Sequence, residues 1–430
     1  MRVMPSAVCG TAAAPASKSA MIRAVAAALL ADGRTTIGNP SRCDDAWAAL
    51  AVARALGARV AAGRDRVTVT GGLAPTGVPL DCRESGLTAR LFPAIAALGT
   101  EAVTITGRGS LLRRPVGPVE NPLRQLGAEC VSTGGHLPLR VRGPLRGGPV
   151  EMEGALTSQF LTGLLMALPM APDDSILTVQ RLASRPYIDL TLTVMRAFGV
   201  IAEHEEYGEF RIRGNQRYRP GEYIVEGDWS GAAFLLVAGA VAGDVVVTGL
   251  DPASTQADHR ILEALAAAGA APEWDAVPGG LTVTERVRIV RAEPRAFEID
   301  LTDAPDLFPP LVALAVHARG RSVLGGADRL AHKESDRATA LIRMFTGLGG
   351  DVRREGDVLV VVGGRRLTGG TVDAGGDHRM AMAAAVAALG AAGPVTIVGA
   401  ECVRKSYPDF FADLATLGAR LVRPAAQSSQ

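Results

Sequence analysis

Basic, hydroxyl and acidic side chains gather at points of the sequence where an apolar, helix-like stretch begins. Lys18 and Ser19 precede one such stretch, residues 157–159 precede another, and residues 377–379 precede a third. Free backbone N–H groups and the helix dipole attract anions to a helix N-terminus, so a cation placed there gains little for folding. Cations at several equivalent positions therefore predict a pocket for a ligand with more than one negative charge.

A second set of predicted helix openings is also basic: Arg114 before Pro115, Arg185 before Pro186, residues 333–337, and Arg404 with Lys405. Arginine can bind a carboxylate or phosphate through two parallel hydrogen bonds, whereas lysine acts as a point charge. For any one of these residues, a solvated surface charge is the simpler interpretation, and a lone serine or threonine is usually a helix cap.

Two acids stand out among these cations, Asp306 in "TDAPDLFPP" and Glu334 in "HKESDR". A carboxylate beside cations can transfer protons. The alternatives are a helix N-cap for Asp306 and a first-turn acid for Glu334; His378 considered alone would be structural. The six histidines show no metal-ligand spacing and no Walker-type glycine loop occurs, so we expect neither a metal nor a P-loop nucleotide site.

The elements that must position these residues recur six times. Each unit reads as helix, strand, helix, strand, strand, with a glycine ending the second helix. These glycines are Gly57, Gly127, Gly199, Gly269, Gly349 and Gly418. Alternating helices and short strands indicate an α/β or α+β fold, and 430 residues predict two domains, hence three units in each.

Composition narrows the class of protein. The net charge is +1 and only 4% of residues are aromatic, which argues against general binding to nucleic acid or to a membrane surface. Five scattered cysteines without a C-x-x-C pair predict reduced thiols in the cytoplasm, and the start of the chain does not resemble a signal peptide. The uncharged stretch 380–400 is broken by "LGAAGP" and predicts a buried helix followed by a strand. We expect disorder after Pro424.

Together these segments resemble one family, 5-enolpyruvylshikimate-3-phosphate (EPSP) synthase or 3-phosphoshikimate 1-carboxyvinyltransferase, along nearly the whole chain. The resemblance rests on "SKSAMIR" (17–23), "RRPVGP" (113–118), "TSQFLTGLLMALP" (157–169), "SRPYIDLTL" (184–192), "EGDWSGAAF" (226–234), "APDLFPPL" (304–311), "HKESDR" (332–337), "DHRMAMA" (377–383) and "KSYPDFF" (405–411).

The resemblance implies an inside-out α/β barrel of two domains, each built of three repeats. Residues 1–14 and 228–430 would form one domain and residues 15–227 the other, with the active site in the cleft between them. It also implies site residues, taken position by position. The catalytic residues would be Lys18, Asp306, Glu334 and His378. Shikimate 3-phosphate would bind to Lys18, Ser19, Arg23, Thr157, Ser158, Gln159, Ser184, Tyr187, Asp306 and Lys333. Phosphoenolpyruvate would bind to Lys18, Gly86, Arg114, Gln159, Arg337, Arg379 and Lys405.

The implied reaction is the transfer of an enolpyruvyl group by addition and elimination, without a cofactor, in a cytoplasmic monomer of the shikimate pathway. With Gly86 present, we expect glyphosate to compete with phosphoenolpyruvate. Some positions depart from the family's usual pattern: Glu84 and Leu87 in "RESGLTAR", Ala331, and Trp229. They leave open a related carboxyvinyltransferase with another hydroxyl acceptor, or a silent ligand-binding relative.

Overall fold

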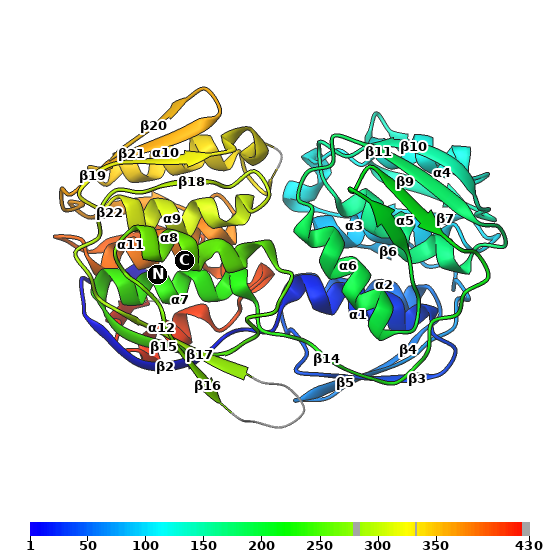
Figure 1. Cartoon of the computed structure of the whole chain (residues 1–430), viewed down its shortest axis with the longest axis horizontal. Coiled ribbons are helices and arrows are strands. Elements are labelled where there is room, and N and C mark those ends of the chain that lie inside the picture. The colour runs from blue at the N-terminus through cyan, green and yellow to red at the C-terminus, as the bar shows by residue number, and fades with distance from the viewer. Residues whose placement is uncertain (278–283, 332, 424–430) are drawn as a thin grey trace, which may run out of the picture. The chain divides into compact units, whose positions relative to one another are not determined.

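The computed structural model describes residues 1–277, 284–331 and 333–423, the side chains of 275–277 and 284–285 excepted. The chain forms two compact units. We call Ala16–Glu226 the inserted unit, and Met1–Pro15 together with Gly227–Gln430 the discontinuous unit. Each is described by itself; Figure 1 gives the element labels and colours the chain by residue number.

The inserted unit has three helices that are buried on almost every side and three outer helices. The buried helices are α1 (Lys18–Leu30), α3 (Gly86–Ala96) and α5 (Gln159–Ala167); the outer ones are α2 (Asp44–Ala55), α4 (Glu120–Gln125) and α6 (Pro186–Ala197). The unit has three four-stranded sheets. The first has the strand order β14 (Glu222–Ile224), β3 (Arg34–Gly38), β5 (Arg66–Thr70), β4 (Arg59–Ala62), and the second has the order β6 (Leu80–Asp81), β7 (Val103–Thr106), β9 (His136–Arg142), β8 (Glu129–Thr133). The third has the order β10 (Gly148–Glu153), β11 (Ser175–Gln180), β13 (Glu209–Ile212), β12 (Glu203–Glu205).

The discontinuous unit repeats this plan. Its buried helices are α7 (Trp229–Ala242), α9 (Phe308–Ala315) and α11 (His378–Leu389); the outer ones are α8 (Ile261–Ala267), α10 (Arg337–Gly347) and α12 (Phe410–Thr416). Its sheets are β2 (Val8–Ala13), β15 (Gly243–Leu250), β17 (Thr284–Val290), β16 (Glu273–Val277); β18 (Glu298–Asp300), β19 (Gly320–Gly325), β21 (Val358–Gly363), β20 (Asp351–Glu355); and β22 (Gly370–Asp373), β23 (Val395–Val398), β1 (Arg2–Val3), β24 (Leu421–Val422).

All six sheets have the same pairing: one parallel pair followed by two antiparallel pairs. A parallel pair needs a long crossover. In four sheets a buried helix connects the two parallel strands; in the other two, α1 comes directly before β3 and α7 directly before β15, while the parallel partners β14 and β2 lie far away in the sequence. Such a helix must be apolar all round, which is why Ala, Leu and Val fill these segments so evenly. The polar residues of a buried helix therefore lie mostly at its start; buried exceptions further along are Arg23 in α1, Arg90 in α3 and Thr162 in α5.

The six predicted glycines confirm the repeat, because each has a positive φ, between +78° and +110°, directly after an outer helix. The predicted order of helix, strand, helix, strand, strand is present, and stretch 380–400 is the expected helix and strand. The predicted five-element unit lacks the parallel partner strand that each sheet has, since these strands have only two to six residues; outside that unit, the resemblance implied only an N-terminal strand that joins the C-terminal half. The predicted disorder after Pro424 falls outside the described residues.

Two of the predicted helix N-termini are wrong. Arg114 follows a 3₁₀ turn, Gly109–Arg113, and the next α-helix begins only at Glu120, because "PVGP" holds the chain in short turns. Lys405 ends, rather than begins, the 3₁₀ turn Ala400–Lys405. No helix among the described residues is long and apolar enough to span a membrane.

The chain passes between the units twice, and each passage is tied to a strand. The backbone N–H of Ser17 donates to the carbonyl of Glu226 (2.8 Å) in the inserted unit, and that of Asp228 donates to Pro15 (2.7 Å) in the discontinuous unit. Strands β14 and β2, which lie just before the passages, complete sheets with β3 and β15, which lie just after them. Each of these two sheets therefore lies within one unit and joins strands that are far apart in the sequence.

Gly227, at one passage, has no room for a side chain. A Cβ there would lie 2.3 Å from the carbonyl oxygen of Gly249 and 3.2 Å from the Cβ of Ala14. We expect Gly227→Ala to lower the free energy of unfolding by about 1–3 kcal/mol, because backbone atoms must shift. Urea unfolding measures the free energy of unfolding of each variant. Gly221→Ala is the control, because a Cβ at Gly221 meets nothing within 4 Å. Equal stability of the two variants would contradict the prediction.

Candidate active site

Predicted site residues lie at or just before the N-termini of five of the six buried helices; the sixth, α7, contributes Ser230, which contacts the predicted residue Arg379. In the inserted unit, Lys18 is the first residue of α1, and Ser17 caps that helix by accepting from the backbone N–H of Ala20 (3.3 Å). The Lys18 ammonium pairs with the Asp45 carboxylate at 3.1 Å. Asp45 lies in the first turn of α2 and is mostly buried. Asp45 was not among the predicted site residues, because nothing in the segment "SRCDDAW" indicates its role before α2 packs against α1.

Arg23 is an internal clamp between α1 and α6. Its buried guanidinium donates to the carbonyls of Ser19 (3.0 Å) and Tyr187 (3.1 Å) and to the hydroxyls of Thr191 (2.9 Å) and Thr162 (3.3 Å). Burial lowers the pKa of Arg23 to about 10, although Tyr187 and Tyr223 oppose the shift. Arg23 thereby fixes Ser19 and Tyr187, both predicted site residues, relative to each other.

The N-terminus of α5 brings Thr157, Ser158 and Gln159 together. Ser158 is the cap residue by position, but its side chain makes no capping hydrogen bond; Thr157 Oγ1 accepts from the N–H of Gln159 instead (3.3 Å). The plain N-cap interpretation of Ser158 is therefore wrong. Arg90, buried on α3, donates to Gln159 Oε1 (2.9 Å) and to the carbonyl of Pro115 (3.1 Å), which joins α5 to the Arg114 segment.

Gly86 begins α3 directly against Arg114. A Cβ on Gly86 would lie 2.5 Å from Nη1 of Arg114, so the absence of a side chain lets the guanidinium occupy its place. Glu84, the unusual acid of this loop, is bound on the other side: its Oε2 accepts from the hydroxyl (3.0 Å) and the N–H (3.2 Å) of Ser110.

Ser184 adopts a left-handed backbone, with φ +60°, and is nearly buried. This conformation costs a non-glycine residue on the order of 1 kcal/mol and persists only where surrounding contacts enforce it. The strain lies one residue before Arg185, the N-cap of α6, and close to Tyr187. The surrounding contacts therefore hold this segment in a backbone conformation that serine does not favour by itself.

In the discontinuous unit, the carboxylate of Asp306 is surrounded by three cations. Arg337 Nη1 lies 2.6 Å from Oδ1, Lys333 Nζ 3.3 Å from Oδ1, and Arg379 Nη2 3.0 Å from Oδ2. Asp306 belongs to the 3₁₀ turn Pro305–Leu307 before α9 and makes no capping bond. The structure thus contradicts its interpretation as an N-cap and places it among the predicted ligand-binding cations.

Arg337 is the centre of a buried ionic network. Besides Asp306, it binds Glu334 through Nη2 (2.5 Å) and Asp377 through Nε (2.8 Å). Asp377 also caps α11 through the N–H of Arg379 (3.0 Å) and accepts from the Ser335 hydroxyl (3.0 Å). Asp377 opens the motif "DHRM", so its role could have been found from its position as a cap.

The network sets the protonation of Asp306 and Lys333. Burial by itself raises the pKa of Asp306, but the positive charges of Arg379, Lys333 and Arg337 outweigh it and hold the pKa well below its usual value. Burial lowers the pKa of Lys333 to about 8, with Asp306 opposing the shift. Asp306 is thus a carboxylate, able to accept but not to give a proton.

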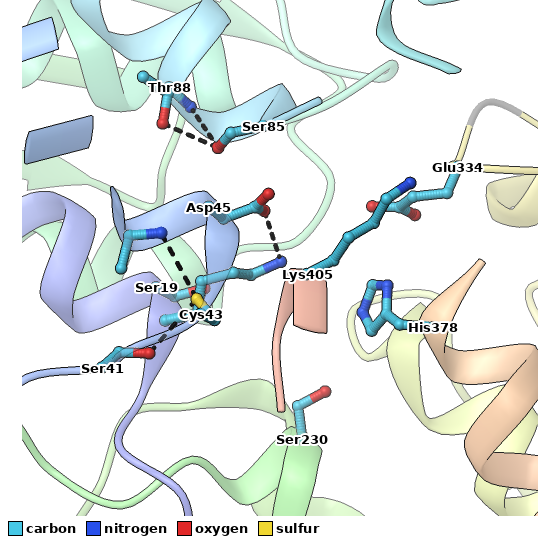
Figure 2. A network of polar contacts seen from close by, with 12 residues as sticks. Ser19, Ser41, Cys43, Asp45, Ser85, Thr88, Ser230, Glu334, His378 and Lys405 are labelled. Atoms are coloured by element: carbon cyan, nitrogen blue, oxygen red, sulfur yellow. Dashed lines mark hydrogen bonds and ion pairs between the residues drawn. The ribbon is translucent and has the colours of Figure 1, made fainter. Parts of the chain in front are cut away.

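His378 and Arg379 begin α11, and both are buried. Arg379 Nη1 lies 2.7 Å from Nε2 of His378. Since arginine only donates, this nitrogen accepts, and His378 carries its proton on Nδ1. A second bond runs from Arg379 Nη2 to the hydroxyl of Ser230 on α7 (2.6 Å), and Lys405 Nζ donates to the carbonyl of Gly376 (2.8 Å). Figure 2 shows the side chains of Ser230, His378, Glu334 and Lys405.

The use of lysine supports a site at these positions. Of the 45 Lys and Arg residues, 42 are arginine, and the three lysines are Lys18, Lys333 and Lys405. All three are predicted ligand-binding residues. Arginine and lysine are not equivalent, since an ammonium is a compact charge and titrates more readily when buried. The three positions that carry lysine in this arginine-rich chain are thus all among the predicted site residues.

The predicted residues are thus grouped within each unit around the ends of its buried helices. Asp45, Arg90, Asp377 and Ser230 hold the predicted residues in place but were absent from the predicted set. Among the described residues, no group of three or more His, Cys, Asp or Glu side chains is arranged to hold a metal ion.

Comparison with solved structures defines the class. A structure entitled EPSP synthase from Acinetobacter baumannii, at 2.37 Å, is similar over 97% of this chain and 98% of its own, with a TM-score of 0.81 and 27% identity. Its fold, two domains forming an inside-out α/β barrel, is the one implied by the sequence.

Sequence comparison gives the family. The profile described as EPSP synthase (3-phosphoshikimate 1-carboxyvinyltransferase) matches residues 4–414. Proteins named 3-phosphoshikimate 1-carboxyvinyltransferase from Aeropyrum pernix and Klebsiella pneumoniae are 42% and 35% identical, each over 419 residues. These matches cover 97% and 95% of this chain, and 96% of each relative. The chain belongs to the EPSP synthase family.

Lys333 is expected to lose its proton near pH 8 rather than near its ordinary pKa of 10.5. Between these values the unfolded chain binds more protons than the folded one, so the free energy of unfolding should rise with pH in that window. Below pH 8 this contribution stays constant. NMR of ¹³C-labelled lysine, with only three signals, measures the pKa directly.

The Lys333→Arg variant lacks one of the three lysine NMR signals, and the missing signal is that of Lys333. In Asp306→Asn the pKa of Lys333 should fall further, because the attracting carboxylate is lost. A lysine signal at position 333 that titrates near pH 10 would contradict the prediction.

Proposed function

We propose that this protein transfers the enolpyruvyl group of phosphoenolpyruvate to the 5-hydroxyl of shikimate 3-phosphate, releasing phosphate, as a transferase of the shikimate pathway. The observation that carries the proposal is the Asp306 carboxylate, held by Arg337, Arg379 and Lys333. A group of cations that already binds one carboxylate can bind the carboxylate of a ligand in its place. The names of the family and its relatives support the same reaction and do not favour a different acceptor.

The substrates would use the residues that the sequence predicted. Shikimate 3-phosphate would bind to Lys18, Ser19, Arg23, Thr157, Ser158, Gln159, Ser184, Tyr187, Asp306 and Lys333. Phosphoenolpyruvate would bind to Lys18, Gly86, Arg114, Gln159, Arg337, Arg379 and Lys405. These residues come from both units, so we propose that residues 1–14 with 228–430, and 15–227, act as two domains on one pair of substrates. We also propose that the enzyme is a cytoplasmic monomer.

The first step adds the two substrates. The 5-hydroxyl oxygen attacks C2 of phosphoenolpyruvate, the hydroxyl proton passes to a base, and C3 gains a proton. Asp306, Glu334, Lys18 and His378 are the candidate groups for these transfers. The charge balance suggests how Asp306 becomes a useful base: once a ligand carboxylate pairs with Arg337 and Arg379, these cations stabilise Asp306 less and its pKa rises.

The second step eliminates phosphate. A proton leaves C3, the C2–C3 double bond re-forms, and the C2–O bond to phosphate breaks. Positioned cations stabilise the charge that develops on the departing phosphate, and such fixed electrostatics usually supply much of the rate. His378 accepts a hydrogen bond from Arg379 through Nε2. In this arrangement Nε2 contacts the arginine and does not serve as a proton donor.

Phosphate release, with each substrate omitted in turn, tests the function. We expect release only when both are present. Lys18→Ala and Glu334→Ala should lower kcat/KM by about 100-fold or more, because proton transfer and electrostatic stabilisation each contribute on this scale. Product mass, measured in the same samples, should equal the acceptor plus an enolpyruvyl group. No release by the folded wild type would overturn the function.

The contact between Gly86 and Arg114 gives a test of the phosphoenolpyruvate site. Gly86→Ala places a methyl group where the guanidinium lies, so we expect KM for phosphoenolpyruvate to rise by about tenfold or more, with KM for shikimate 3-phosphate much less affected. Gly347→Ala, in a helix with open space around its Cβ, is the control. An unchanged KM for phosphoenolpyruvate in Gly86→Ala would show that Arg114 does not belong to the phosphoenolpyruvate site.

A further inference from the structure

Arg379 is held by three different acceptors in the discontinuous unit. Nη1 donates to His378 Nε2 (2.7 Å) and Nη2 donates to Ser230 Oγ (2.6 Å), while Nη2 also forms an ion pair with Asp306 Oδ2 (3.0 Å). Arg379, His378 and Ser230 are at most 6% exposed. Within the described part of the chain, the buried Nε of Arg379 has no hydrogen-bond partner. A buried, unsatisfied N–H is costly and indicates that a ligand can complete the set.

The three acceptors differ in what they do to the charge of Arg379. Asp306 neutralises it and competes with any ligand carboxylate. Ser230 carries no charge, so its hydroxyl can orient the guanidinium and leave the positive charge available. When a ligand carboxylate displaces Asp306, Ser230 is one of the contacts that can remain.

Ser230 is itself fixed to the protein. It is the second residue of α7, and its N–H donates to Asp228 Oδ1 (3.1 Å). The preceding N–H, of Trp229, donates to Gln256 Oε1 (3.1 Å), and Gln256 Nε2 donates to the carbonyl of Gly227 (2.7 Å). The indole of Trp229 donates to the carbonyl of Asp251 (3.1 Å) and packs edge-on against His259, with ring centroids 4.6 Å apart.

A purely structural role does not account for this placement of Ser230. Serine is favoured at a helix start as the N-cap, but Asp228 occupies that position and makes the capping bond. Inside a helix, serine has a lower helix propensity than alanine. The strongest contact of its hydroxyl is with an arginine on another buried helix. The hydroxyl therefore serves Arg379 rather than α7.

We propose that Ser230 is a positioning residue that orients Arg379 for the carboxylate of phosphoenolpyruvate. The inference deepens the proposed function and rests on it, because it takes Arg379 as part of the phosphoenolpyruvate site. Ser230 acts through the arginine and touches no reacting atom. Its removal should weaken binding of one substrate more than it slows the chemistry.

Steady-state kinetics with each substrate varied separately test the proposal. Ser230→Ala should raise KM for phosphoenolpyruvate by about tenfold, the usual effect of losing one hydrogen bond to a charged group, with kcat changed by less than about threefold. KM for shikimate 3-phosphate should stay near that of the wild type. Ser230→Thr, which keeps the hydroxyl, should restore KM to within about threefold of the wild type.

Ser322→Ala is the matched control. Ser322 is a fully buried serine of the same unit, on β19, and its hydroxyl accepts from the backbone N–H of Phe297. This variant should lose stability without a change in either KM. Unchanged KM for phosphoenolpyruvate in Ser230→Ala, or an equal rise in Ser230→Thr, would overturn the proposal, the latter because it would show that packing rather than the hydroxyl matters.

Failure of the proposed function gives a different result. If the wild type releases no phosphate, the function is wrong, and the orientation of Arg379 is measured by its rate of modification with phenylglyoxal, followed by peptide mass spectrometry. Loss of the serine contact should then raise the rate in Ser230→Ala several-fold over the wild type and Ser322→Ala. Equal rates would overturn the positioning role as well.

Discussion

The structure depends on the burial of six helices on all their sides. A helix in that position can satisfy its backbone internally except at its ends, where four N–H groups remain without helical partners. Nearly all of its polar chemistry must therefore gather in the first turn or just before it. Lys18, Gln159 and Arg379, three of the proposed site residues, lie at such ends.

The same burial explains why acids accompany the cations. A cation at a positive helix end, away from water, needs a counter-charge. In the inserted unit Asp45 supplies it to Lys18, and in the discontinuous unit Asp306, Glu334 and Asp377 supply it to Arg337 and its neighbours. Each unit thus pairs the cations at its helix starts with carboxylates of its own.

The sequence predicted the repeat, the glycines that end the outer helices and the helix starts that carry most of the site, because these depend on local backbone preferences and on apolar periodicity. It did not predict the short parallel strands, such as β6 and β18, whose existence depends on pairing partners distant in sequence. Nor did it predict Asp45 or Ser230, since their roles come from contacts between helices. Arg114 was misplaced because prolines near it interrupt the helix that its position suggested.

Pairing between strands that are far apart in the sequence sets an order in which the protein can be completed as it is synthesised. All three sheets of the inserted unit are available once β14 has left the ribosome. The discontinuous unit must wait, because β1 pairs with β23 and β24, which lie near the other end of the sequence. β1 is thus made first and paired last, whereas β2 can pair with β15 as soon as that strand has been made. Until β23 and β24 are made, the backbone groups of β1 are open to pairing with another chain, while the inserted unit can already complete its three sheets.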